Sequence, residues 1–144
     1  MRRGRNNAVS VIDLFTPRAE LVALPKPTRD VILALRIWAV LIREKRCPHH
    51  AVAAHVGSLQ AAAHLQLMLE EIGAAWPDRF TVSPLCCRHL SHDEETLGGM
   101  MRLAIGKDRP GFDRLLGEMI GPAQRELLFH SASVLGRLMD ASRS

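Results

Sequence analysis

Residues 28–46 read TRDVILALRIWAVLIREKR and contain the most apolar stretch of the chain, residues 31–42, in which only Arg36 is charged. Thr28 suits the start of a helix, because its hydroxyl can accept a hydrogen bond from the first free backbone N–H groups. Asp30 falls in the first turn, where the helix dipole favours an acid. A helix that is apolar around most of its circumference is usually central in its fold. We therefore predict a central helix over residues 28–46.

This predicted helix carries a stripe of arginines but is too short in its apolar part to cross a membrane. Arg29, Arg36 and Arg43 recur every seven residues, which places them along one line of the helix. A membrane span needs about 20 apolar residues, more than the stretch provides. We expect a core helix and no contact with a membrane.

Further helices are predicted on both sides of a short extended segment, Phe80–Ser83. A helical stretch from His49 to about Ile72 is interrupted near Gly57-Ser58, and Gly73 is a natural residue to end it. Ser91-His92-Asp93-Glu94 has the pattern of a capping box, in which Ser and Glu bond reciprocally to the backbone at a helix start.

The helix that begins at Ser91 is predicted to reach about Ile105. Gly98-Gly99 within it costs stability, which suggests close approach of a neighbouring helix or a kink. Asp108-Arg109-Pro110 opens another helix, and Gly121-Pro122 starts the last one.

The composition agrees with an all-α fold. Of the 144 residues 47% are hydrophobic, only 4% are aromatic and none is Tyr, whereas strands favour aromatic and β-branched residues. We predict one all-α domain, a bundle of five or six helices with a short extended segment. Residues 1–27, which contain several prolines, are predicted to be a weakly structured, mobile basic arm, and residues 28–144 the helical domain.

The cellular setting follows from the cysteines and the N-terminus. Three cysteines, two of them adjacent, make a poor disulfide framework. The basic N-terminus is not followed by the apolar region of a secretory signal. We expect reduced thiols and a cytoplasmic location.

Cysteines and histidines gather at two predicted helix junctions. Cys47 and His49 lie at the first, and Cys86 and His89 at the second. Thiolate and imidazole are the ligands that zinc prefers, in a tetrahedral set of four. These four residues are therefore candidate zinc ligands, although their spacing only partly matches that of known zinc sites. Ordinary packing of cysteines as small apolar residues is the alternative.

The second junction also suggests a reactive thiol. Cys86 and Cys87 stand beside Arg88 and His89, whose positive charge would favour a thiolate. The two thiols could also form a redox-responsive pair. The sequence identifies no third group that would orient a histidine as a base, as nucleophilic catalysis requires.

Nucleic-acid binding is a further alternative, based on charge. Residues 1–46 hold ten Arg or Lys against four Asp or Glu, a net of +6 within a total of +4. Ala53 and Gly57 have the four-residue offset found in helix-turn-helix units. Residues 59–72, which would form the recognition helix, contain no Lys or Arg. A solvated basic tail and a buried helical hairpin explain the same residues.

Two stretches resemble an uncharacterised family of small alphaproteobacterial helical proteins. One is Leu24-Pro25-Lys26-Pro27 leading into the apolar helix, and the other is Pro84-Leu85-Cys86-Cys87-Arg88 followed by Asp93-Glu94. The resemblance implies a helical fold over most of the chain from Leu24 onward. It implies no activity, substrate or ligand.

No catalytic motif is recognisable, so an enzyme is not expected. The chain contains no phosphate-binding glycine loop, no serine nucleophile elbow and no carboxylate–histidine metal motif. Faces rich in Met, Ala and Leu are adaptable at protein interfaces. We predict a non-enzymatic protein that acts through contacts with a protein partner or as a homo-oligomer.

Overall fold

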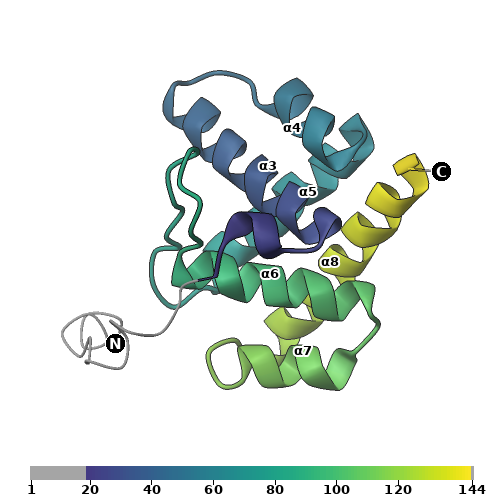
Figure 1. The fold of residues 1–144 in the computed structure, drawn as a ribbon. Helices are drawn as coiled ribbons and strands as arrows, with labels where there is room; N and C mark the ends of the chain where they lie inside the picture. Colours follow the sequence, from purple (N-terminus) through teal and green to yellow (C-terminus); the bar gives the residue numbers. More distant parts are fainter. Residues whose placement is uncertain (1–18, 144) are drawn as a thin grey trace.

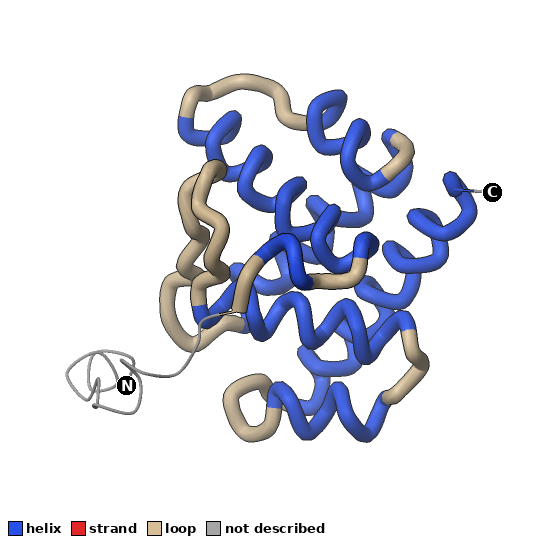
Figure 2. The backbone as a smooth tube through the Cα atoms, in the orientation of Figure 1, coloured by secondary structure: helices blue, strands red, loops and turns tan. Residues whose placement is uncertain are grey.

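The computed structural model describes residues 19–143 and has an all-α architecture. Its elements are, in chain order, the 3-10 helix η1 (Leu21–Ala23) and the α-helices α3 (Lys26–Arg43), α4 (His49–Val56), α5 (Leu59–Ala75), α6 (His92–Ile105), α7 (Arg109–Leu116) and α8 (Pro122–Arg143). The described residues contain no strand, only helices and loops (Figures 1 and 2). The predicted bundle of five or six helices is confirmed.

The helices form one bundle in which α8 connects the two halves of the chain. Helix α3 packs on α4 and α6, and α5 packs on α4. Helix α8 packs on α5 from the first half and on α6 and α7 from the second (Figure 1). No helix in residues 19–143 combines the length and apolar character that crossing a membrane requires.

A single apolar core lies between these helices. Its residues are less than one tenth exposed and include Val31, Ile32, Leu65, Met68, Leu97, Met100, Phe112, Leu128 and Leu135. They come from α3, α5, α6, α7 and α8, so every long helix contributes its apolar side. Burial of such side chains stabilises a fold by about 1.5–3 kcal/mol each.

The N-terminal arm predicted for residues 1–27 falls largely on residues 1–18, which lie outside the described part of the chain. Residues 19–27 correct the prediction, because they are packed on the domain. The backbone N–H of Leu21 donates to the carbonyl of Arg88 over 2.8 Å, and the side chain of Leu21 is buried. Close to this contact, Glu20 and His89 form an isolated antiparallel bridge.

Helix α3 begins at Lys26 rather than Thr28. Pro25 occupies the cap position and Pro27 lies in the first turn, where its missing N–H would have no partner in any case. The helix therefore starts within the residues that are predicted to form the weakly structured arm. The helix ends at Arg43, followed by Lys45 with φ +60°.

The interruption predicted near Gly57-Ser58 is confirmed. Gly57 has φ +104°, which ends α4, and the Ser58 hydroxyl accepts a hydrogen bond from the Ala61 N–H over 3.0 Å at the start of α5. The predicted helix end at Gly73 is wrong, since α5 continues to Ala75. Gly73 simply takes helical geometry there, with no neighbouring side chain near it.

The capping box at the start of α6 is confirmed in both of its hydrogen bonds. The Glu94 N–H donates to the Ser91 hydroxyl over 3.0 Å, and the Ser91 N–H donates to the Glu94 carboxylate over 2.9 Å. The close approach predicted at the paired glycines is also observed. A Cβ on Gly99 would lie 3.0 Å from Leu115 of α7, and one on Gly98 would lie 3.3 Å from Thr28 of α3.

The last two helices start where the sequence predicts. The Asp108 side chain accepts from the Gly111 N–H over 2.9 Å at the start of α7, and Pro122 opens α8. The segment Phe80–Ser83 is neither helical nor paired with a strand. Its backbone is instead held by side chains of α6.

Candidate functional site

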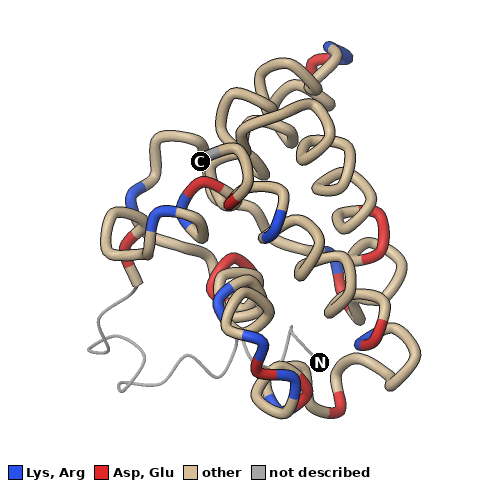
Figure 3. The backbone as a smooth tube through the Cα atoms, turned by 90° about the vertical axis from the view of Figure 1, so that its right-hand side faces the viewer, with Lys and Arg blue, Asp and Glu red and all other residues tan. Residues whose placement is uncertain are grey.

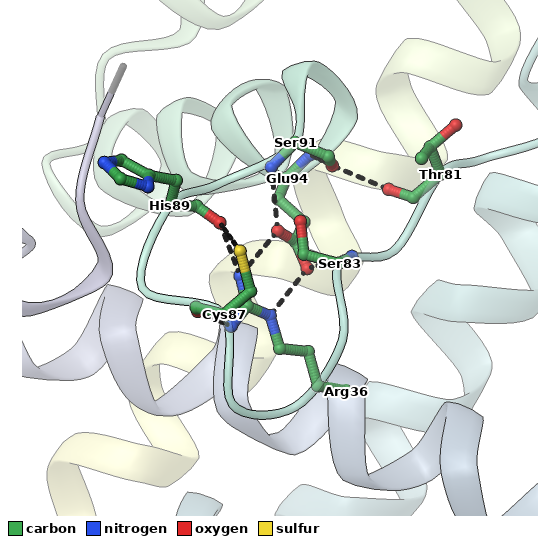
Figure 4. Close-up of polar contacts among 7 residues, drawn as sticks. All are labelled: Arg36, Thr81, Ser83, Cys87, His89, Ser91 and Glu94. Carbon is green, nitrogen blue, oxygen red and sulfur yellow. Dashed lines mark hydrogen bonds and ion pairs between the residues drawn. The ribbon is translucent and has the colours of Figure 1, made fainter. Parts of the chain in front are cut away.

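Arg36 is the most deeply buried charged side chain of α3 and forms a two-pronged ion pair with Glu94 of α6. Its Nε donates to one carboxylate oxygen of Glu94 and its Nη2 to the other, both over 2.9 Å. Both side chains are fully buried. The predicted arginine stripe therefore does not face solvent as a unit, because Arg36 lies beneath the segment that leads into α6 (Figure 4).

Glu94 accepts two further hydrogen bonds from backbone groups. The Ser83 N–H donates to it over 3.1 Å, in addition to the Ser91 N–H of the capping box. Burial alone would raise the pKa of Glu94, but the hydrogen bond with Arg36, the backbone donors and the positive charge outweigh it and hold the pKa below its usual value. The carboxylate is therefore ionised, and both of its oxygens accept hydrogen bonds from Arg36 and from backbone N–H groups.

The same arginine also binds the backbone of the segment between α5 and α6. Arg36 donates to the carbonyl of Cys87 over 2.5 Å and to the carbonyl of His89 over 3.1 Å. Asp93 of α6 accepts hydrogen bonds from the Thr81 N–H and from the indole of Trp76. We call these contacts of Arg36, Asp93 and Glu94 the clamp, because they hold residues 76–91 against α3 and α6. The polar groups of Arg36 and Glu94 thus serve to stabilise the fold.

The clamp places two of the predicted zinc ligands on the outside of this segment. Cys86 is exposed, and His89 is half-buried with its carbonyl bound to Arg36. Cys87 is half-buried, and its thiol lies 3.4 Å from the same carbonyl, to which it donates. Among residues 19–143 no three or more His, Cys, Asp or Glu side chains are grouped as metal ligands. The structure thus does not bring Cys47, His49, Cys86 and His89 together.

The other two predicted ligands do meet, and a third residue joins them. Cys47 Sγ lies 3.3 Å from His49 Nδ1 in the turn before α4. The far side of the ring, His49 Nε2, lies 2.6 Å from the side-chain oxygen of Gln66 on α5. Gln66 in turn donates to Glu70 over 3.2 Å. The structure therefore supplies the orienting group that sequence alone does not identify at a thiol–imidazole pair.

This contact changes the acidity of both groups. The pKa of the Cys47 thiol is lowered by the backbone N–H of His49 and then by the hydrogen bond to its ring. The pKa of His49 is raised by the hydrogen bond with Cys47 and then by the one with Gln66. Both shifts favour a thiolate beside an imidazolium. Cys47 is exposed, so a thiolate formed there lies at the surface.

The predicted helix-turn-helix unit has the expected break, but α8 covers the turn. A Cβ on Gly57 would lie 2.0 Å from the Ser142 hydroxyl near the end of α8. The second helix of the unit, α5, contains no Lys or Arg. Helix α5 also packs on α8.

A groove of about 1070 Å³ lies between the end of α6, the turn into α7, and α8, and Pro27 at the start of α3 also lines it. The end of α6 and the turn into α7 lie at the right-hand side of Figure 1. Apolar side chains line the groove, including Ile105, which is 41% exposed, and Leu127, which is 55% exposed. At Gly136 the two helices approach closely, because a Cβ there would lie 2.8 Å from Ile105.

Charged residues of both signs border the groove. The basic ones are Lys107, Arg109 and Arg137, and the acidic ones are Glu126 and Asp140. Figure 3 views the molecule from this side, and basic and acidic positions alternate along its backbone.

Sequence reasoning misses the clamp, the Gln66 contact and the groove. The spacing of the arginines places Arg36 on the apolar helix, and the capping box singles out Glu94, but nothing local pairs them across 58 residues. The one available signal is that Arg36 interrupts an apolar run, since a charge buried in a core needs a partner.

The chain matches no protein family, no curated protein and no solved structure.

Proposed function

We propose that this chain is a non-enzymatic protein that acts through protein contacts, and that it self-associates through the exposed face of α8. The observation that carries the proposal is the pattern of residues on that face. Glu126 and Arg137 are eleven positions apart, about three helical turns, and so lie on the same side of α8. Neither side chain has an ion pair among the described residues.

Two copies of this face are complementary when the helices run antiparallel. If Glu126 lies opposite Arg137 of the second copy, then His130 lies opposite Ser133, because these residues follow the same side of the helix. Leu127, which is 55% exposed, borders this line of residues, and Ile105, which is 41% exposed, is another exposed apolar side chain of the groove. A two-fold dimer repeats each of these contacts twice, because the same patch is used on both copies.

This arrangement also accounts for the mixed charge of the groove. In each copy, Glu126 pairs with Arg137 of the other copy, and Arg137 pairs with Glu126 of the other copy. Exposed charge pairs contribute only about 0–1 kcal/mol each, so their main effect is on register and choice of partner. Burial of the exposed apolar side chains of Leu127 and Ile105 supplies most of the affinity.

The test is the oligomeric state in solution. We expect sedimentation equilibrium of the full chain to report a dimer, and Leu127→Asp to shift it to the monomer. Leu59→Asp is a matched control, because Leu59 is equally exposed at 53% but lies outside the groove. A monomeric wild-type protein at all concentrations tested contradicts the proposal.

A charge exchange tests the register. Glu126→Arg and Arg137→Glu each place like charges together and should weaken the dimer, whereas the double variant should restore it. Additive weakening in the double variant would exclude the antiparallel register.

A further inference from the structure

The turn between α3 and α4 brings together a nucleophile, a base and an orienting group. Cys47 is exposed, and its sulfur lies 3.3 Å from His49 Nδ1. The two residues lie on either side of the start of α4. His49 begins α4, while Cys47 precedes Pro48, the residue before that helix. The thiol is therefore presented at a helix start, where the free backbone N–H groups favour a negative charge.

Gln66 determines which nitrogen of the neutral His49 ring carries the proton. Its side-chain oxygen can only accept a hydrogen bond, so the proton of the neutral ring is on Nε2, 2.6 Å away. The lone pair of Nδ1 is then directed at the Cys47 thiol. The bond from Gln66 to Glu70 holds the amide in the orientation that this requires. A thiol, a base and an amide that orients the base form the arrangement that activates sulfur nucleophiles.

We propose that Cys47 is a covalent modification site that forms mixed disulfides with small-molecule disulfides, with His49 as the base. His49 Nδ1 takes the thiol proton, and the thiolate attacks one sulfur of the disulfide. A bond forms between Cys47 Sγ and that sulfur while the original S–S bond breaks. The leaving thiolate receives the proton from His49. The small disulfide is the oxidant, so one disulfide is consumed and one mixed disulfide and one thiol are produced.

The other two cysteines lack this environment. Cys86 is exposed like Cys47, but no hydrogen bond of its thiol with an imidazole is observed in residues 19–143. Cys87 is half-buried, and its thiol lies against the His89 carbonyl. Cys86 is therefore an internal reference for an ordinary exposed thiol, and the inference does not depend on the dimer.

The experiment compares two single-cysteine forms of the full chain with oxidised glutathione as the probe. Cys86→Ser/Cys87→Ser retains Cys47, and Cys47→Ser/Cys87→Ser retains Cys86. An ordinary thiol is only about 3% ionised at pH 7, so activation leaves much room for a faster rate. We expect intact-mass measurements to report mixed-disulfide formation about fivefold or more faster at Cys47 than at Cys86 at pH 7.

Two further variants assign the cause. In the form that retains Cys47, His49→Ala should remove the rate advantage and move the pH profile of the reaction to higher pH. Gln66→Leu should move the profile in the same direction by a smaller amount, because it acts through the orientation of His49. Circular dichroism verifies that each variant is folded. Equal rates at Cys47 and Cys86, or a pH profile unchanged by His49→Ala, overturns the proposal.

Discussion

At the scale of single residues, we expect loss of the ion pair between Arg36 and Glu94 to lower the free energy of unfolding most. Glu94→Gln keeps the shape of the side chain but leaves the Arg36 charge buried without its partner and turns an amide N–H₂ toward other donors. We expect a loss of about 3–5 kcal/mol in the free energy of unfolding at pH 7. Urea denaturation measures it.

The pH dependence of that loss has a definite sign. The folded-state pKa of Glu94 is lowered, so its stabilising contribution is present above the unfolded-state pKa and is lost as the pH falls through the folded-state value. The difference between wild type and Glu94→Gln should therefore shrink on acidification below about pH 4. Glu95→Gln is the control, since Glu95 is the exposed neighbour in the same helical turn. A difference that stays constant with pH would contradict the ion-pair explanation.

At the scale of elements, two glycines should respond in opposite directions to the same substitution. Gly57→Ala places a Cβ at φ +104° and within 2.0 Å of the Ser142 hydroxyl, so we expect a loss of about 1–3 kcal/mol. Gly73→Ala adds a Cβ in open space within α5, so we expect a gain of about 0.5–1 kcal/mol. Thermal unfolding of both variants checks the signs. A neutral Gly57→Ala would mean that neither backbone conformation nor the α8 contact matters at this turn.

At the scale of the whole molecule, the contacts of α8 and the clamp predict one cooperative unfolding transition. Helix α8 packs on both halves of the chain, and Arg36 joins α3 to α6. Trp38 in α3 and Trp76 beside Asp93 report on this junction by fluorescence, while circular dichroism reports on all helices. The two signals should give coincident transitions. A separate earlier fluorescence transition would show that residues 76–91 detach first.

The sequence by itself determined where most helices begin and end, because those signals are local. Ser91 and Glu94 cap α6 across three residues, and Gly57 ends α4 through its own backbone conformation. Some of its failures were local too. At Gly73 the propensity of a single residue was outweighed by the helix around it, and at Pro27 the proline fits the first turn of α3.

Only the tertiary structure decided which distant side chains meet. Arg36 and Glu94 are 58 residues apart, and His49 and Gln66 are 17 apart, so each contact depends on how the helices pack and not on any spacing along one element. The same holds for the groove, whose lining comes from α6, the turn into α7 and α8. Local rules follow from the geometry of one helix, whereas partners across the bundle follow from the shared burial of several helices.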